Sequence, residues 1–261
     1  MKKIILALML GLLIVSVVAC KTAVPKPEVV IFNDAVLEAR IRVIMNTPTG
    51  DILVSEAEKI SELDLSEANP SVPSARIKDI SALKYFKNLR GLNLSYQLVE
   101  DLSPLANLTE LNMFGYWGAA SLKNFDGLAN LTNMLDINIS SYNEGIGTNF
   151  TDSDLAYFAN MTNLEAITLQ GSKITDLSPL ANLSKLRKLN IDYSDISDLS
   201  PISEMTSLVE MDLKYTNVSE LGPLENFVKL QDLWLEGCPI TDYSPLTAIY
   251  PNLVHKDFSI D

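Results

Sequence analysis

The chain has 261 residues, of which 47% are hydrophobic and 20% charged, and its formal net charge is −13. Lys2 and Lys3 fall in a predicted leader, so the mature chain keeps 18 of its 20 basic residues against 33 acidic ones, a charge of −15. This acidic balance disfavours nucleic acids and anionic lipid headgroups as direct partners. No zinc-ligand spacing, phosphate-binding loop or dinucleotide fingerprint occurs, so the sequence predicts no cofactor.

Residues 1–19 are predicted to be a secretory signal peptide. Lys2 and Lys3 precede an apolar run over 4–18, which is too short for the roughly 20 residues that span a bilayer. The run ends Val17-Val18-Ala19-Cys20, which resembles a bacterial lipobox. This resemblance implies cleavage before Cys20, a diacylglyceryl group on its thiol, and an extracytoplasmic protein anchored to the cell membrane. An ordinary signal peptide with a chance cysteine and an uncleaved anchor are the alternatives.

Residues 20–30, with Pro25 and Pro27, are predicted to be an extended tether. Residues 31–62 are predicted to form a helical N-terminal cap. Asp34 is placed to cap a helix whose apolar residues share one face: Leu37, Ile41, Ile44 and Met45. Ser55, with Glu58 three positions on, has the spacing of a capping box for a second short helix.

Residues 63–250 are predicted to be a repeat array, because one pattern recurs without gaps at 174–191, 196–213 and 218–235, a period of 22 residues. The first copy shows its seven apolar positions: Ile174, Leu177, Leu180, Leu183, Leu186, Leu189 and Ile191. One copy cannot enclose so many apolar side chains, but stacked copies can cover one another. The Leu-x-Ile step alternates like a short strand, and Ser178-Pro179 opens a segment that is long enough only for a 3₁₀ turn.

These residues resemble the leucine-rich repeat, and the 22-residue length with the Asp-Leu-Ser-Pro-Leu segment is similar to the bacterial, internalin-like subtype. The resemblance implies an α/β right-handed solenoid with a parallel concave sheet, 3₁₀ or irregular convex segments and a helical N-terminal cap. It also implies a cell-surface recognition or adhesion module. Residues 251–261 depart from the pattern and are predicted to be a C-terminal cap.

The earlier copies are less regular. Strands are predicted at Leu63, Leu92, Leu111, Ile137 and Ile167, which gives spacings of 29, 19, 26 and 30 residues before the period settles at 22. The departures fall after strands, in Glu67–Arg76, Phe114–Leu122 and Ser141–Asp152. Because insertions in solenoids gather on one face, which is often the binding face, we expect these stretches to line one edge.

Aromatic side chains mark the candidate binding surface, since such anchors are enriched where protein partners bind. The predicted partner-binding residues are Phe114, Tyr116, Trp117, Tyr193, Tyr215 and Trp234. Scattered exposed aromatics are also ordinary on a protein surface.

Other chemistry-bearing residues point to structural roles. His255 is the only histidine and nothing around it suggests a catalytic pair. With Cys20 assigned to lipid, Cys238 lies in one column with Ser172, Ser194 and Thr216, where the chain bends. An acidic column contains Asp176, Asp198, Glu220 and Asp242. Each precedes a Ser-Pro or Gly-Pro turn that it can cap, and a calcium ladder is the alternative.

The sequence therefore predicts a non-catalytic, monomeric, lipid-anchored surface protein whose solenoid binds a protein partner through its concave face or strand-end loops. Binding of a polysaccharide or peptidoglycan by the same aromatic residues is the alternative.

Overall fold

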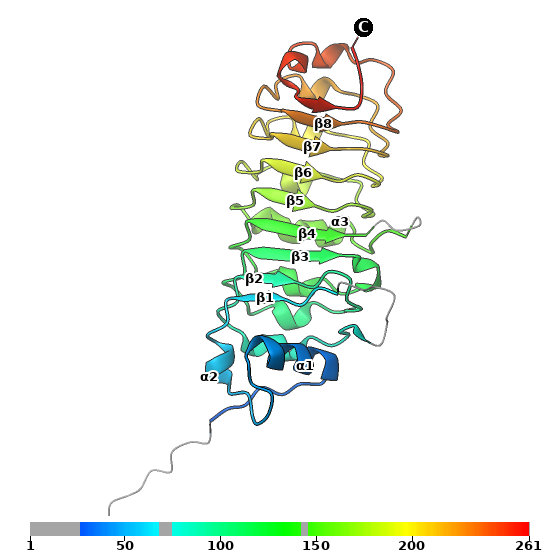
Figure 1. Ribbon diagram of the computed structural model, residues 1–261. Coiled ribbons are helices and arrows are strands. Elements are labelled where there is room, and N and C mark those ends of the chain that lie inside the picture. Colours follow the sequence, from blue (N-terminus) through cyan, green and yellow to red (C-terminus); the bar gives the residue numbers. More distant parts are fainter. Residues whose placement is uncertain (1–26, 68–74, 142–145, 261) are drawn as a thin grey trace, which may run out of the picture.

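The computed structural model describes residues 27–67, 75–141 and 146–260. These residues form one solenoid with a nine-stranded parallel sheet, in which every strand pairs with the next one along the chain (Figure 1). This architecture confirms the predicted solenoid and its concave parallel sheet. The leader 1–19, Cys20 and most of the tether lie outside the described residues.

The elements follow in chain order. The strands are β1 (Glu62–Asp64), β2 (Gly91–Asn93), β3 (Met113–Trp117), β4 (Asp136–Ser140), β5 (Ala166–Thr168), β6 (Lys188–Asn190), β7 (Glu210–Asp212), β8 (Asp232–Trp234) and β9 (His255–Lys256). The α-helices are α1 (Ala35–Ile44), α2 (Val54–Ala57) and α3 (Asp152–Leu155). Short 3₁₀ turns, such as Ser178–Leu180 and Ser200–Ile202, form the convex side.

Each coil is held by the apolar columns that the sequence repeats. In the coil of β6, the residues from Ile174 to Ile191 that define the columns are all at most 1% exposed. Full burial of one such side chain contributes about 1.5–3 kcal/mol, so a coil is stable only when neighbours cover both of its sides. The core is therefore a continuous apolar column along the solenoid axis.

Three of the four residues of the acidic column cap their convex turns, as predicted. Asp176 Oδ1 accepts a hydrogen bond from the Ser178 amide at 2.8 Å, and Asp198 and Asp242 do the same for Ser200 and Ser244. Hydrogen bonds from the hydroxyl and the amide of Ser200 hold the pKa of Asp198 below its usual value, and those from the amide and the hydroxyl of Ser244 do the same for Asp242. The described residues contain no cluster of three possible metal ligands, and these carboxylates are engaged in their own turns.

The predicted position of the third strand was wrong. Phe114, and not Leu111, pairs with Leu92 of β2 and Ile137 of β4. Phe114 and Tyr116 occupy the core columns filled by Leu189 and Ile191 three coils later, and Met113 is exposed. The spacings are therefore 22 and 23 residues instead of 19 and 26, and the turn after β3 is an ordinary coil corner without an insertion.

The N-terminal end is covered by α1 and α2 (Figure 1). Asp34 caps α1 as predicted, since its Oδ1 accepts from the amides of Val36 and Leu37. Leu37 and Ile41 are completely buried beneath the helix. The predicted cap of α2 was wrong: Ser55 lies inside the helix, and Leu53 precedes it without a side-chain cap.

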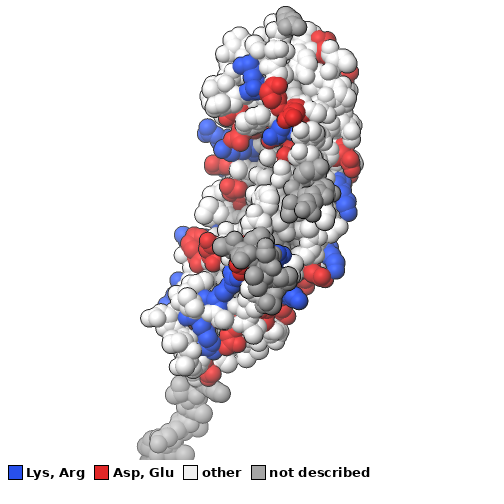
Figure 2. Space-filling view, turned by 45° about the vertical axis from the view of Figure 1, so that its right-hand side comes forward, with Lys and Arg blue, Asp and Glu red and all other residues white. Residues whose placement is uncertain are grey.

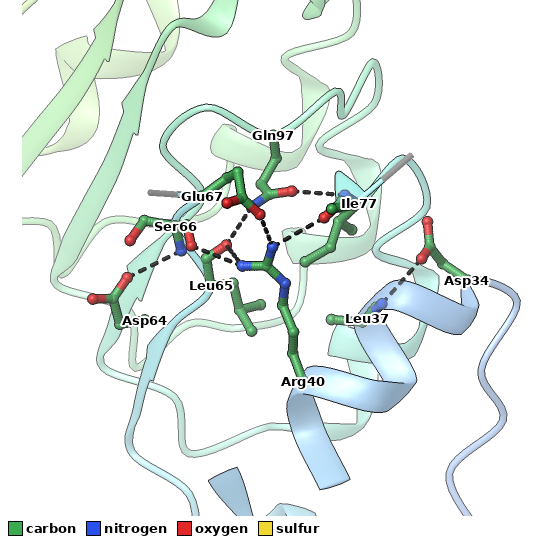
Figure 3. Close-up of polar contacts among 10 residues, drawn as sticks. Asp34, Leu37, Arg40, Asp64, Leu65, Ser66, Glu67, Ile77 and Gln97 are labelled. Atoms are coloured by element: carbon green, nitrogen blue, oxygen red, sulfur yellow. Dashed lines mark hydrogen bonds and ion pairs between the residues drawn. The ribbon is translucent and has the colours of Figure 1, made fainter. Parts of the chain in front are cut away.

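Arg40 of α1 joins this cap to the first coils (Figure 3). Its guanidinium donates to the carbonyl oxygens of Leu65 at 3.2 Å, Ser66 at 2.7 Å and Ala75 at 3.0 Å, and it forms an ion pair with Glu67. One side chain thus fixes the residues on both sides of segment 68–74, which lies outside the described residues. The helical cap and the first coil are consequently one packed unit.

The C-terminal end closes with β9. Leu233 of β8 pairs with Lys256, and the Asp257 carboxylate accepts hydrogen bonds from the amides of Leu235 and Glu236 at 2.8 and 2.9 Å. Phe258 stacks on Tyr243 with ring centroids 5.2 Å apart. These contacts satisfy backbone groups that an uncovered last strand would expose.

Candidate functional site

The candidate site is built at the corner where each strand ends. The backbone passes there through the left-handed region: the column contains Tyr96, Gly118, Gly171, Tyr193, Tyr215 and Gly237, with φ between 54° and 78°. A residue with a Cβ pays about 1–2 kcal/mol for this conformation, and glycine does not. Three coils use glycine, so the corner requires no side chain. The three tyrosines therefore occupy a strained position for which their rings must compensate.

Tyr193 and Tyr215 form the centre of this edge. Their rings stack with centroids 4.5 Å apart and an interplanar angle of 14°. Gly237 leaves room for the ring of Tyr215, because a Cβ at Gly237 would approach Cδ1 of Tyr215 to 2.4 Å. The Tyr215 side of the stack is open to solvent, with 42% of the residue exposed. Adjacent coils thus present parallel aromatic rings at an accessible edge.

A carboxylate fixes the outer end of the stack. The Tyr215 hydroxyl donates to Glu236 Oε1 at 2.7 Å. This hydrogen bond raises the pKa of Tyr215 to about 12, because ionising the phenol would break it and place two negative charges together. Tyr215 therefore keeps its proton at any physiological pH, and its ring orientation is set by Glu236.

Trp234 lies on the adjacent strand, where it pairs with Asp212 of β7. It is an outward-facing, half-buried residue of β8, and Lys214 Nζ lies 5.9 Å from the centre of its ring. The same ammonium forms an ion pair with Asp212 Oδ2 at 3.1 Å. We call Tyr193, Tyr215 and Trp234 the aromatic patch. It combines apolar rings with charged neighbours, as protein-binding hot spots do.

A second aromatic pair lies on the same edge nearer the N-terminus. Tyr96 and Trp117 pack with ring centroids 5.2 Å apart, and Gly118 leaves space for Tyr96 as Gly237 does for Tyr215. The coils of β4 and β5 separate this pair from the aromatic patch. Trp117 is half-buried and remains a candidate contact residue. Tyr96 was not among the predicted contact residues, because no sequence pattern indicated its packing on Trp117.

Two predicted site residues are not on the surface. Phe114 is 2% exposed and Tyr116 is completely buried, because both point inward from β3. The Tyr116 hydroxyl accepts from the Val99 amide at 3.0 Å and lies within hydrogen-bond distance of the Gln97 carbonyl at 3.1 Å. Burial raises the pKa of Tyr116. These two aromatics are core residues, so the predicted partner-binding role of Phe114 and Tyr116 was wrong.

Burial also perturbs the carboxylate beside the patch. Asp192 is 2% exposed, and its Oδ2 accepts from Gln170 Nε2 at 2.8 Å. Oδ1 finds no hydrogen-bond donor among the described residues. Burial, together with the nearby charge of Asp212, raises the pKa of Asp192 to about 6, although the hydrogen bond from Gln170 opposes the shift. Figure 2 shows red and blue side chains intermixed over the upper part of the sheet face.

The remaining reactive side chains have structural partners. His255 Nδ1 lies 2.6 Å from Asp232 Oδ1 on the exposed sheet face. The Cys238 thiol contacts the Leu213 carbonyl at 3.0 Å and Thr216 Oγ1 at 3.3 Å. Among the described residues, the hydrogen bonds include no Ser–His or Cys–His pair of the kind that nucleophilic catalysis uses. Across the same residues, no helix is both long and apolar enough to traverse a bilayer.

Solved structures share this fold, although a scan of protein-family models and a search of the curated proteins found no match. Internalin C2 of Listeria monocytogenes is similar over 90% of this chain and 99% of its own, with 24% identity and a TM-score of 0.76. A leucine-rich-repeat protein of Leptospira interrogans is similar over 78% of this chain and 62% of its own, with 16% identity and a TM-score of 0.55. The plant peptide hormone receptor RGFR1, solved in complex with RGF2, is similar over 77% of this chain and 32% of its own, with 14% identity and a TM-score of 0.58. The chain therefore has the leucine-rich-repeat fold seen in internalins.

Proposed function

We propose that this chain is a non-catalytic cell-surface lipoprotein whose solenoid binds a protein partner through the aromatic patch. The observation that carries the proposal is the pair Tyr193 and Tyr215, held at positive φ in a column where other coils use glycine. A strained backbone conformation at such residues persists when contacts or a function of the side chain offset its free-energy cost. Two stacked rings at an exposed edge offer rigid apolar area at low conformational cost, which is what protein interfaces concentrate.

The similar structures support a protein partner. One of them is a plant peptide hormone receptor solved in complex with RGF2. The fold that it shares with this chain presents a long open sheet. The nine strands of the described sheet, at about 4.8 Å each, extend over roughly 40 Å. A standard protein interface buries about 800 Å² on each partner, so an open sheet of that length can accommodate one.

Glycan binding is the second candidate, and the aromatic stack is what favours it. Pyranose rings pack on tyrosine and tryptophan faces, and Tyr193, Tyr215 and Trp234 offer such faces along one edge. A pull-down of the chain on purified peptidoglycan or polysaccharide separates the two candidates. Retention that depends on the aromatic patch supports the glycan, and retention only on protein-bearing membranes supports the protein.

Replacing Tyr215 with glycine is expected to weaken partner binding by about 2 kcal/mol, or roughly 30-fold, without unfolding the chain. Glycine is the matched substitution because it occupies this corner after β3, β5 and β8. It removes the ring and also relieves the backbone strain. Surface plasmon resonance against the captured partner, together with a thermal melt, measures both effects.

The control for that experiment is Lys185→Glu on the exposed convex side, which is expected to leave the affinity unchanged. If Tyr215→Gly binds like the wild type and Lys185→Glu does not, the partner uses the convex side and the proposed site is wrong.

The lipid anchor belongs to the same proposal and rests on Val17-Val18-Ala19-Cys20, outside the described residues. The Cys20→Ser variant is expected to lack the acyl groups and to be processed differently, because serine has no thiol for the diacylglyceryl transfer. Intact-mass analysis of the membrane-extracted chain tests this. Finding wild-type Cys20 without a lipid would contradict the anchor while leaving the binding site untouched.

A further inference from the structure

The concave face has a hollow over its first four strands. Its volume is about 440 Å³, and Gly91 and Gly115 lie at its base. The Glu62 carboxylate lies over Gly91, where an added Cβ would meet Oε2 at 1.7 Å. An added Cβ at Gly115 would make only an ordinary contact, at 3.6 Å from Asn93 Oδ1. The missing side chain at Gly115 therefore leaves a depression in the sheet face, whereas the Glu62 carboxylate occupies the space over Gly91.

Three carboxylates line this hollow: those of Glu62, Asp64 and Asp136. In the part of the chain that the structure describes, none of the three takes part in an ion pair. Farther along the same face, by contrast, Glu210 pairs with Lys188 at 2.7 Å and Asp212 with Lys214 at 3.1 Å. Burial raises the pKa of Asp136, and Lys188 opposes that shift only partly. The hollow is thus a region of negative charge that Lys188 compensates only in part.

The hollow also has an apolar wall. Met113 lines it and is 49% exposed, because it faces outward on the strand while the next residue, Phe114, is buried. Lysine and arginine side chains combine an apolar stem with a charged head. A stem packed on Met113 with its head among the carboxylates matches both features of the hollow. Neutral or acidic side chains match only one of them or neither.

The spacing of the carboxylates indicates how a partner would lie. Glu62 and Asp64 belong to β1 and Asp136 to β4, so they are three strand steps apart, about 14 Å along the solenoid axis. An extended chain covers that distance in about four residues. Because side chains alternate between faces with a period of two, residues four apart point to the same side. Two basic residues at i and i+4 of an extended segment therefore reach both groups.

A buried carboxylate lies farther along the face. Asp192 follows β6, which is two strand steps beyond β4. This carboxyl is 2% exposed, and Oδ1 has no hydrogen-bond partner among the described residues. The aromatic patch lies directly beyond it, at the ends of β6 to β8.

We propose that the concave face receives an extended, positively charged segment of the protein partner, with two lysine or arginine residues four positions apart that occupy the hollow over β1 to β4. This inference rests on the proposed protein-binding function and specifies the chemistry of the partner. The segment runs along the sheet face towards the aromatic patch. The excess of acidic residues on the chain, a net −13, favours the approach of such a segment.

Synthetic peptides test the spacing. Three capped glycine–serine peptides of equal length contain two arginines four residues apart, two arginines three residues apart, or two glutamines. Each is titrated into the ¹⁵N-labelled full chain in detergent, and the backbone amide shifts are recorded. The four-apart peptide is expected to bind about five-fold more tightly than the three-apart peptide and to shift amides of β1 to β4. The glutamine peptide is expected to cause no shift.

Two variants separate shape from overall charge. Gly115→Leu fills the hollow with every carboxylate in place and is expected to weaken binding of the four-apart peptide at least about ten-fold. Asp136→Asn and the convex, exposed Glu225→Gln each remove one negative charge, and only Asp136→Asn is expected to weaken binding, by about five-fold. Thermal melts verify that each variant is folded.

The proposal is overturned if both arginine peptides bind equally, or if Asp136→Asn and Glu225→Gln have the same effect. Tyr215→Gly is expected to bind the peptide normally, because the aromatic patch lies outside the hollow. Suppose that the two arginine peptides bind equally but Tyr215→Gly still weakens binding of the cell-surface partner. This inference would then be refuted, and the proposed function would stand.

Discussion

Leu189→Asp is expected to abolish folding of the coils around β6. Leu189 is 1% exposed, and its paired neighbours Ile167 and Met211 are completely buried. An unpaired carboxylate at this site costs several kcal/mol, a large share of the roughly 5–15 kcal/mol that stabilises a domain. Because solenoid stability is a sum over neighbouring coils, the loss should spread to the adjacent coils. Circular dichroism and hydrogen exchange of the variant measure the extent of unfolding.

The matched control is Asn182→Asp, which adds the same charge at an exposed position of the same coil. Its free energy of unfolding is expected to lie within about 0.5 kcal/mol of the wild-type value. A Leu189→Asp variant that melts like Asn182→Asp would show that the inward and outward positions of the strands have been exchanged.

Arg40→Met is expected to destabilise the N-terminal end by about 2–4 kcal/mol. Methionine keeps much of the aliphatic stem but loses the bonds to Leu65, Ser66 and Ala75 and the ion pair with Glu67 (Figure 3). The first coil then loses its connection to α1 on both sides of segment 68–74. Faster hydrogen exchange in α1 and β1, with β6 to β8 unchanged, is the expected signature.

Arg42→Met is the control for this variant. Arg42 lies on the same helix and bonds to Glu38, Thr47 and Gly50, all within eight residues. Its loss is expected to cost no more than about 1 kcal/mol, as is usual for contacts near a surface. Equal exchange rates in the two variants would mean that the long-range contacts of Arg40 do not hold the cap.

The repeat made most of the fold predictable. A 22-residue period with seven apolar columns fixes which residues face inward, and β5 to β8 pair in the register that the columns imply. The prediction failed at β3 because Phe114 and Tyr116 stand where other copies have aliphatic residues. Leu111 and Met113 offered the more familiar Leu-x-Met step. Aromatic side chains in a core column look like surface anchors when their burial is unknown.

The candidate site was predictable only in part. Tyr193, Tyr215 and Trp234 were recognised from their columns, but the left-handed backbone of the two tyrosines depends on the corner geometry of the coil. Gly118, Gly171 and Gly237 occupy the same column as the tyrosines. Glycines in that column of the sequence would have indicated a left-handed backbone there, and this signal was missed. The contacts of Arg40 join residues 25 to 35 positions apart, and no local pattern indicates them.

The most direct test of the account is a photo-crosslink on intact cells. A photoreactive phenylalanine analogue replaces Tyr215 in one variant and the convex Lys185 in another, and the covalent adducts are identified by mass spectrometry. The account predicts a protein adduct at position 215 and none at position 185. An adduct formed only from position 185, or a polysaccharide adduct at position 215, would contradict the central claim that the strand-end edge binds a protein.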